Sequence, residues 1–245
     1  MITGVAFVPS TPMLLPAVSA GASGEIEPMR EAALAALRRA CSSGPEQVVV
    51  LGAGSVGRAS LANGFVAYDS GIGSVRGFGV PFDVPLDPAQ PPGDHPHLPL
   101  SLTVGAWLLS QVGWPGERRA LEIDPAADDH TLDRIAATVA DDVRRTVLLV
   151  VADGSAARSE KAPASLHPDS AAFDSYVASA LRAGSAADLI ALDRSGAVEV
   201  SAQGRPAWRV AARACAAGAS FDAALTIDEA PYGVGYFVAS WLART

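Results

Sequence analysis

Three glycines follow a run of β-branched residues in the stretch QVVVLGAGSVG, residues 47–57. Gly52, Gly54 and Gly57 have the spacing G-x-G-x-x-G. In a dinucleotide-binding fold, this spacing forms a tight turn between a strand and a helix whose N-terminus faces the pyrophosphate. The stretch therefore raises the hypothesis of an oxidoreductase that uses NAD or FAD.

The residues after the glycines argue against this hypothesis. The segment SVGRASLA is followed by Asn63 and Gly64, and then by Gly71 and Gly73. A helix between these breaks is too short for the usual crossover between parallel strands. Asp69 meets the requirement for a ribose-binding acid only weakly, and the motif lies on the second expected strand rather than the first. We predict a glycine-rich turn from a strand to a loop, with no bound cofactor.

Histidines are the next candidates, because imidazole can ligate a metal or transfer protons. The segment GDHPHLP places His95 and His97 in an H-x-H pair beside Asp94. Such a group could bind a metal, although packing within a loop is the favoured interpretation. His130, in DDHTLD, is expected beside a helix start, and His167, in SLHPDS, in a turn.

A serine and two cysteines complete the set of nucleophiles. Ser155 follows Asp153 in DGSAA, which is not the G-x-S-x-G motif of serine hydrolases. Cys41 and Cys215 are far apart and form neither a C-x-x-C motif nor a zinc-binding spacing. We expect both cysteines to be small buried side chains.

Composition narrows the class of protein. Of the 245 residues, 49% are hydrophobic, and the formal net charge is −8. This charge disfavours a nucleic-acid partner, because an acidic surface repels phosphate. No apolar run reaches the roughly 18–20 residues of a membrane helix, and the N-terminus lacks the basic region of a signal peptide. We expect a cytoplasmic protein without a membrane association.

Apolar periodicity predicts alternating strands and helices. The expected strands are 2–8, 47–51, RRALEI, 146–152, SFDAALTID and GYFVASWLA, with shorter pieces at FVAY and GFGV. The expected helices are 25–41, 100–112, 131–145, 169–183 and 205–217. This alternation, without a linker, predicts one α/β domain over residues 1–245, with a central mostly parallel sheet flanked by helices on both faces.

Three segments in this order resemble one protein family. They are VAFVPSTPMLLPAVS near the start, VVADGSAARSEKAPASLHPDSAAFD in the second half, and EAPYGVGYFVASWL near the end. The chain is similar to the LigB-like class III extradiol ring-cleavage dioxygenases and to the related Memo-like proteins. Those proteins have a Pro-His-Pro-Pro turn, a Gly-Asp-x-Ser-His segment and a closing Glu-x-Pro-Phe-Gly-Val-Gly-Tyr strand. The resemblance implies the LigB-like extradiol dioxygenase fold.

The resemblance also implies iron chemistry, for which this chain lacks the residues. The family holds Fe(II) with two histidines and a carboxylate, and a further histidine acts as acid and base. Ser10 and Gly54 stand where the ligand histidines are expected, and Ala156 stands at the position of the acid/base histidine. Only Glu229 remains as a family-equivalent carboxylate. We therefore expect neither stoichiometric iron nor cleavage of catechols.

Three hypotheses follow. The first is a divergent family member without its iron site, whose pocket includes Asp153 and Ser155. Such a protein binds a small molecule or a protein partner, or it is an enzyme of changed chemistry. The alternative is an active oxygenase with displaced ligands, namely His95, His97 and Glu229. The third is a dinucleotide-dependent oxidoreductase that uses the three glycines.

The resemblance carries two further expectations. It implies a homo-oligomer. It also predicts that residues 2–8, 47–51 and 146–152 are adjacent strands, with Ser10, Gly54 and Ser155 together at their carboxyl ends.

Overall fold

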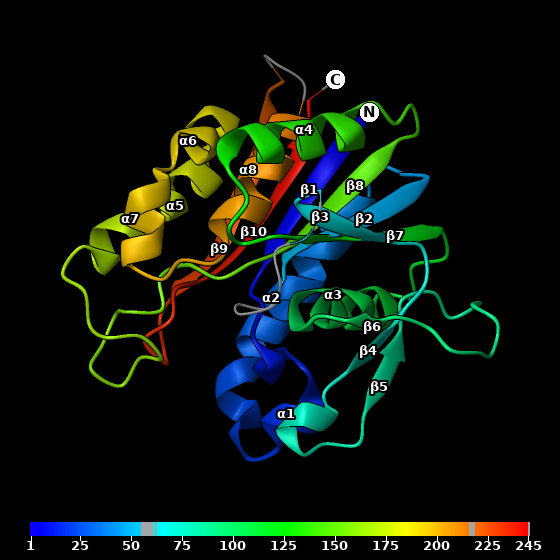
Figure 1. Ribbon diagram of the computed structural model, residues 1–245, viewed down its shortest axis with the longest axis horizontal. Helices are drawn as coiled ribbons and strands as arrows, with labels where there is room; N and C mark the ends of the chain where they lie inside the picture. The colour runs from blue at the N-terminus through cyan, green and yellow to red at the C-terminus, as the bar shows by residue number, and fades with distance from the viewer. Residues whose placement is uncertain (55–60, 62, 216–218, 245) are drawn as a thin grey trace.

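The computed structural model describes residues 1–54, 61, 63–215 and 219–244 of the chain. Among these residues, a seven-stranded sheet with the order β3-β7-β2-β8-β1-β10-β9 forms the centre of the molecule (Figure 1). Its strands are β1 (Ile2–Val8), β2 (Gln47–Ala53), β3 (Phe65–Tyr68), β7 (Glu117–Ile123), β8 (Thr146–Val151), β9 (Phe221–Glu229) and β10 (Tyr236–Ala243).

The sheet is mixed. Its centre consists of the parallel strands β7, β2, β8 and β1, whereas β3, β10 and β9 pair antiparallel. The prediction of a mostly parallel sheet is therefore right for the centre and wrong for the margins. The short connection between β9 and β10 explains one margin, because a short turn joins antiparallel strands and a parallel pair needs a long crossover.

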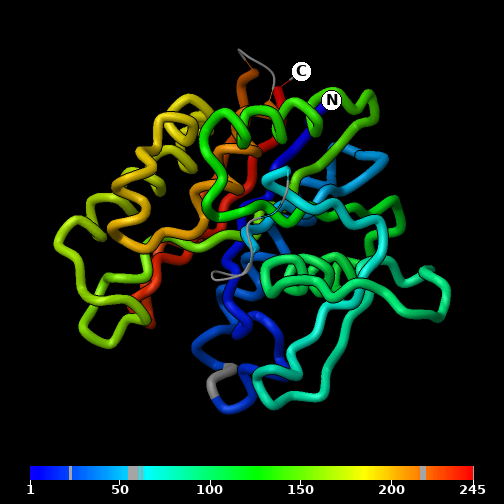
Figure 2. The backbone as a smooth tube through the Cα atoms, viewed as in Figure 1, coloured from blue at the N-terminus to red at the C-terminus, as the bar shows by residue number. Residues whose placement is uncertain are grey.

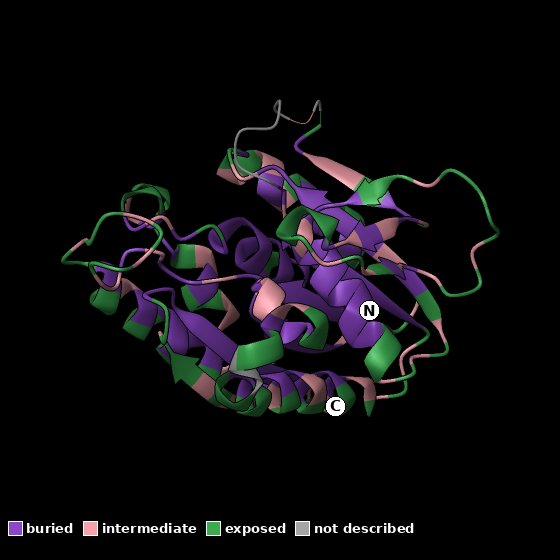
Figure 3. Cartoon of the chain, turned by 90° about the horizontal axis from the view of Figure 1, so that it is seen from below, coloured by how far each residue is buried: buried purple, intermediate pink, exposed green. Residues whose placement is uncertain are grey.

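Helices cover both faces of the sheet, as predicted for an α/β domain. The helices are α1 (Pro16–Ser19), α2 (Ser23–Cys41), α3 (Leu100–Gln111), α4 (Asp129–Ala140), α5 (Ser170–Ala183), α6 (Ala186–Ala191), α7 (Arg194–Glu199) and α8 (Arg205–Ala214). One face packs against α4, α5, α6 and α8, and the other packs against α2 and α3. In Figure 3 the buried strands lie between helices whose outer surfaces are exposed.

Alternating side chains of each central strand supply the two cores. In β1, Phe7 belongs to the core beneath α8, and Val8 belongs to the core beneath α2 and α3. In β2, Leu51 likewise belongs to the core beneath α8, and Val50 belongs to the core beneath α2 and α3. Since successive side chains of a strand point to opposite faces, an unbroken apolar run is what a strand covered on both faces needs.

A small second sheet lies beside α3. It has the order β5-β4-β6 and consists of β4 (Ile72–Ser74), β5 (Asp83–Pro85) and β6 (His97–Leu98). The chain trace places this sheet on the opposite side of the molecule from α5, α6 and α7 (Figure 2). The polypeptide between β3 and α3 therefore adds to the layer formed by α2 and α3.

Several element boundaries differ from the predictions. The segment GFGV was expected to be a strand, but Arg76–Phe78 forms a 3-10 turn that ends at Gly79, whose φ is +79°. Helix α4 ends at Ala140 rather than at residue 145, because the Asp142 carboxylate accepts hydrogen bonds from the backbone N–H and the guanidinium of Arg144 and turns the chain. The end of the expected helix 205–217 lies partly outside the described residues.

No helix in the described part of the chain combines the length and the apolar character that crossing a membrane requires.

Candidate functional site

A cavity of about 220 Å³ lies where β1, β2 and β8 end. The strand β8 pairs with both β1 and β2, which confirms the predicted adjacency of these strands. Because they are parallel, their carboxyl ends meet at one edge of the sheet, where open α/β folds bind ligands. The cavity is lined by Ser10, Ala53, Val151, Ala152, Asp153, Gly154, Ala156, Pro163, Ser201, Gln203 and Val234.

Asp153 is the acidic residue among those that line the cavity. Its Oδ1 accepts a hydrogen bond of 2.7 Å from the backbone N–H of Ser10. Protein surrounds the carboxyl group, and the surface that the residue retains borders the cavity. This burial raises the pKa of Asp153 to about 7, and the bond from Ser10 opposes the rise only in part. Near neutral pH, the group can therefore both accept and donate a hydrogen bond.

Tyr236 lies close to this carboxyl group at the start of β10. The residue is only 5% exposed, and its hydroxyl lies near the side chain of Thr11. Burial raises the pKa of Tyr236 to about 12, and the nearby negative charge of Asp153 adds to the rise. The phenol therefore stays protonated at neutral pH.

Asp174 of α5 holds the loop that follows β8. Its carboxylate accepts hydrogen bonds from the backbone N–H of Ser155 at 2.8 Å and from the Ser155 hydroxyl at 2.7 Å. Arg158 donates to the same carboxylate at 2.9 Å. Ser155 is fully buried and is not among the residues that line the cavity. Its hydroxyl therefore fixes the loop instead of facing a ligand.

The positions carried over from the resemblance do not all meet. Ser10 and Ala156 line the cavity, and Gly54 directly follows Ala53, which also lines it. Glu229 is exposed on the edge strand β9 and is not among the lining residues.

Packing accounts for two of the three glycines of the G-x-G-x-x-G stretch. Gly52 lies inside β2, where a Cβ atom would collide with the Ser101 side chain of α3. A Cβ on Gly54 would lie 2.6 Å from Oε1 of Glu122, which is buried on β7. Gly57 lies outside the described residues, and the absence of dinucleotide binding stays a prediction.

None of the four histidines is among the residues that line the Asp153 cavity. His95 hydrogen bonds to the carbonyl of Pro91 at 2.7 Å, and His97 is exposed on β6. His130 is in the first turn of α4, and the His167 backbone and ring accept hydrogen bonds in the turn before α5, as predicted for both. Across the described ranges, no three His, Cys, Asp or Glu side chains are placed to hold a metal. His95, His97 and Glu229 are therefore not brought together.

The groups that line the cavity do not fit iron. They offer the carboxyl group of Asp153, the hydroxyls of Ser10 and Ser201, and the amide of Gln203. The family's site uses two neutral imidazoles with one carboxylate. Neutral hydroxyl and amide oxygens are weak donors for Fe(II) by comparison, so this set is no substitute.

Among the polar lining residues, Ser201 and Gln203 were not predicted from the sequence. Ser201 and Gln203 lie between α7 and α8 and reach the cavity because the N–H of Gly204 donates to the carbonyl of Asp153 at 3.1 Å. The one available signal was the segment QGRP, in which Gly and Pro mark the start of a helix. That signal places a loop at this point but does not say which strand end the loop meets.

Comparisons with known proteins add little. No family model matches the chain, and no curated protein matches it. Among solved structures, the chain is similar to an uncharacterized protein, JW3007, from Escherichia coli K12, with a TM-score of 0.45 and 11% sequence identity. The match covers 98% of this chain and 99% of that chain. A likeness of this degree identifies neither a family nor a function.

Proposed function

We propose that this protein is a divergent relative of the LigB-like extradiol dioxygenases that binds a small molecule in the Asp153 cavity and does not cleave aromatic rings. One observation carries the proposal. The ends of β1, β2 and β8 enclose a cavity whose lining includes one acidic group, held by the N–H of Ser10. Open α/β sheets bind their ligands at this position.

The chemistry of the cavity supports binding rather than oxygenation. A carboxyl group with a pKa of about 7 recognises a hydroxyl or an amine, because it accepts hydrogen bonds in its ionised form. Surrounding protein strengthens such bonds relative to water. Ser10 and Ala156 line the same space and supply neither an imidazole ligand nor an acid/base group.

The oxygenase part is tested on protein purified without oxygen or chelator. We expect no stoichiometric iron by elemental analysis and no oxygen uptake with protocatechuate or simple catechols. About one iron per chain together with oxygen uptake would overturn this part of the proposal. If His95→Ala or His97→Ala then abolished the oxygen uptake, the hypothesis of an active oxygenase with displaced metal ligands would replace this part of the proposal.

The binding part is tested by filling the cavity. A fragment library is titrated against isotope-labelled protein, and we expect hydroxyl- or amine-bearing fragments to shift the amide signals of residues 151–156. Ala156→Leu should abolish these shifts. The matched control is Ala187→Leu, because Ala187 is exposed on α6. If Ala156→Leu left the fragment-induced shifts of the amide signals unchanged, the Asp153 cavity would not be the binding site.

A further inference from the structure

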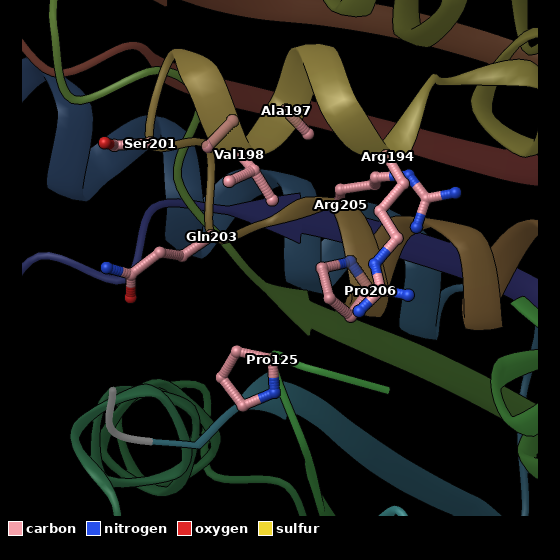
Figure 4. Close-up of a pocket in the computed structure, with 9 residues that line it drawn as sticks. Pro125, Arg194, Ala197, Val198, Ser201, Gln203, Arg205 and Pro206 are labelled. Carbon is pink, nitrogen blue, oxygen red and sulfur yellow. The ribbon is translucent and has the colours of Figure 1, made fainter. Parts of the chain in front are cut away.

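A second cavity adjoins the first. It has a volume of about 280 Å³ and lies between α7, the start of α8 and Pro125 (Figure 4). Ser201 and Gln203 line both cavities. The two cavities are therefore neighbours, and we call the two together the groove: Asp153 lines one part of it and Arg194 lines the other.

An arginine lines the second part of this groove. Arg194 is exposed, and its Nη2 donates a hydrogen bond of 2.7 Å to the carbonyl of Ala126. Within the described residues, its remaining N–H groups have no hydrogen-bond partner. Arg205 also lines this cavity but is committed elsewhere, to the Leu192 carbonyl at 2.8 Å and to the Asp129 carboxylate at 2.6 Å. Arg194 is thus the cation that can meet a ligand.

Between Arg194 and the junction at Ser201 and Gln203, the second cavity has a mostly apolar wall. The second cavity is walled by Ala197, Val198, Pro125 and Pro206, and Val198 is 71% exposed. Figure 4 shows Ser201 and Gln203 on one side of this cavity and the two arginines on the other. A ligand that spans the groove needs an apolar body between two polar ends.

Ser201 is strained at the junction of the two cavities. Its φ is +56°, and it follows α7 at a position where helices usually have glycine. The N–H groups of Ser201 and Ala202 close the helix end on the carbonyls of Val198 and Ala197, at 3.0 and 2.7 Å. A non-glycine residue in this conformation that also lines both cavities points to a role in binding.

We infer that the groove binds an elongated organic acid. Its anionic group pairs with Arg194, its apolar body lies against Val198 and Pro206, and a hydroxyl or ammonium group donates a hydrogen bond to Asp153. The Asp153 end rests on the proposed function, whereas the Arg194 end goes beyond it. A guanidinium pairs well with a carboxylate because it presents parallel N–H donors.

Three matched probes test the inference on the full chain. They are 3-(4-hydroxyphenyl)propionate, its uncharged amide, and 3-phenylpropionate, which lacks the hydroxyl. Dissociation constants are measured by calorimetry or NMR at mildly alkaline pH, where Asp153 is largely ionised. We expect the hydroxy acid to bind about tenfold more tightly than either analogue, because each analogue loses one charge-assisted hydrogen bond.

Variants assign the two ends. Arg194→Gln should remove the preference for the acid over the amide and leave the preference for the hydroxyl. Arg244→Gln is the control, because Arg244 is exposed and follows β10 beside the amino end of β1, away from the groove. Ser201→Gly should weaken binding of the hydroxy acid without lowering the melting temperature, which distinguishes a binding role from a structural one.

The outcomes separate the inference from the proposed function. If the acid and the amide bind equally, and Arg194→Gln changes neither while Ala156→Leu abolishes both, the inference is wrong and the proposed function stands. If no probe binds at low-millimolar concentration while library fragments still shift the amide signals of residues 151–156, the inference is wrong and the proposed function stands. If probes bind but Ala156→Leu leaves the binding of every probe and every fragment unchanged, both are wrong.

Discussion

At the scale of single residues, Asp153 combines a cost to stability with a capacity to bind. The group has a hydrogen bond from the N–H of Ser10, but desolvation outweighs that bond and raises its pKa from 3.8 to about 7. An ionised carboxylate in this place is less stable than the same group in the unfolded chain. A carboxyl group whose pKa is shifted by burial at a cost to stability is common at binding and catalytic sites.

Replacing Asp153 by asparagine should remove this cost. Between the two pKa values, the folded state keeps a proton that the unfolded state has lost, so the stability of the wild type falls as pH rises through this window. Asparagine does not ionise and still offers an oxygen to Ser10. We expect the free energy of unfolding of Asp153→Asn to exceed that of the wild type by about 4 kcal/mol at about pH 8 and by much less at about pH 4.

Urea unfolding at several pH values measures this difference. The control is Asp94→Asn, an identical change at an exposed loop position, which should leave the pH dependence of the wild type intact. A variant that is less stable than the wild type at alkaline pH would contradict the raised pKa.

The residues that line the cavity differ in how well the sequence predicts them. Ser10 and Ala156 could be predicted as site residues, because the family resemblance aligns them with the family's histidine positions. The structure places both at one cavity. Ser201 does not emerge, because nothing in its neighbourhood signals a positive φ or a contact with the end of β8. Its place depends on how α7 and α8 dock, which is a tertiary property.

At the scale of elements, one side chain of α5 ties the loop after β8 to the rest of the domain. Asp174 is 1% exposed and accepts two hydrogen bonds from Ser155 and one from Arg158. The loop also hydrogen bonds to the start of β10, from the N–H of Gly154 to the carbonyl of Gly235 at 2.7 Å. The position of the cavity floor therefore depends on a helix that does not itself line it.

Removing this carboxylate should be costly. We expect Asp174→Ala to lower the free energy of unfolding by about 3–4 kcal/mol, because the buried donors of Ser155 lose their acceptor. Ser155→Ala, which removes only the hydroxyl donor, should cost about 1 kcal/mol. Asp169→Ala changes an exposed aspartate just before α5 and should stay within about 0.5 kcal/mol of the wild type. Equal losses in all three variants, measured by urea unfolding, would show that Asp174 has no special role.

Strands and long helices were predictable, and short helices were not. The apolar runs of β1, β2 and β8 and the periodicity of α2 and α5 are strong local signals. Helices α6 and α7 have six residues each, too few to show a helical period. The parallel pairing of the central strands could be inferred from the alternation of strands and helices. The antiparallel pairing at the margins of the sheet depends on turns, which the apolar periodicity of the sequence does not reveal.

At the scale of the whole molecule, the two sheets differ in how far their strands are buried. The strands β2 and β8 are buried along almost their whole length, whereas β4, β5 and β6 each have half-buried or exposed positions. The large sheet has helices on both faces. The small sheet lies outside this arrangement, beside α3.

Native-state hydrogen exchange should resolve this difference. We expect amides of β1, β2 and β8 to exchange only through global unfolding, and amides of β4 and β6 to open at a lower free energy. The helix α3 is the internal comparison, because it contacts both sheets. If β2 and β4 exchanged with the same free energy and the same denaturant dependence, the molecule would unfold as one unit.

The position of β1 has a consequence for synthesis of the protein in the cell. This strand leaves the ribosome long before its neighbours β8 and β10, which lie far later in the chain. Its apolar residues therefore stay without a partner strand while most of the chain is being made, and the sheet closes only after β10 emerges. Such long-range pairing slows folding and prolongs the interval in which a nascent chain aggregates. A chaperone that shields the segment VAFV during translation would protect the most vulnerable part of this polypeptide.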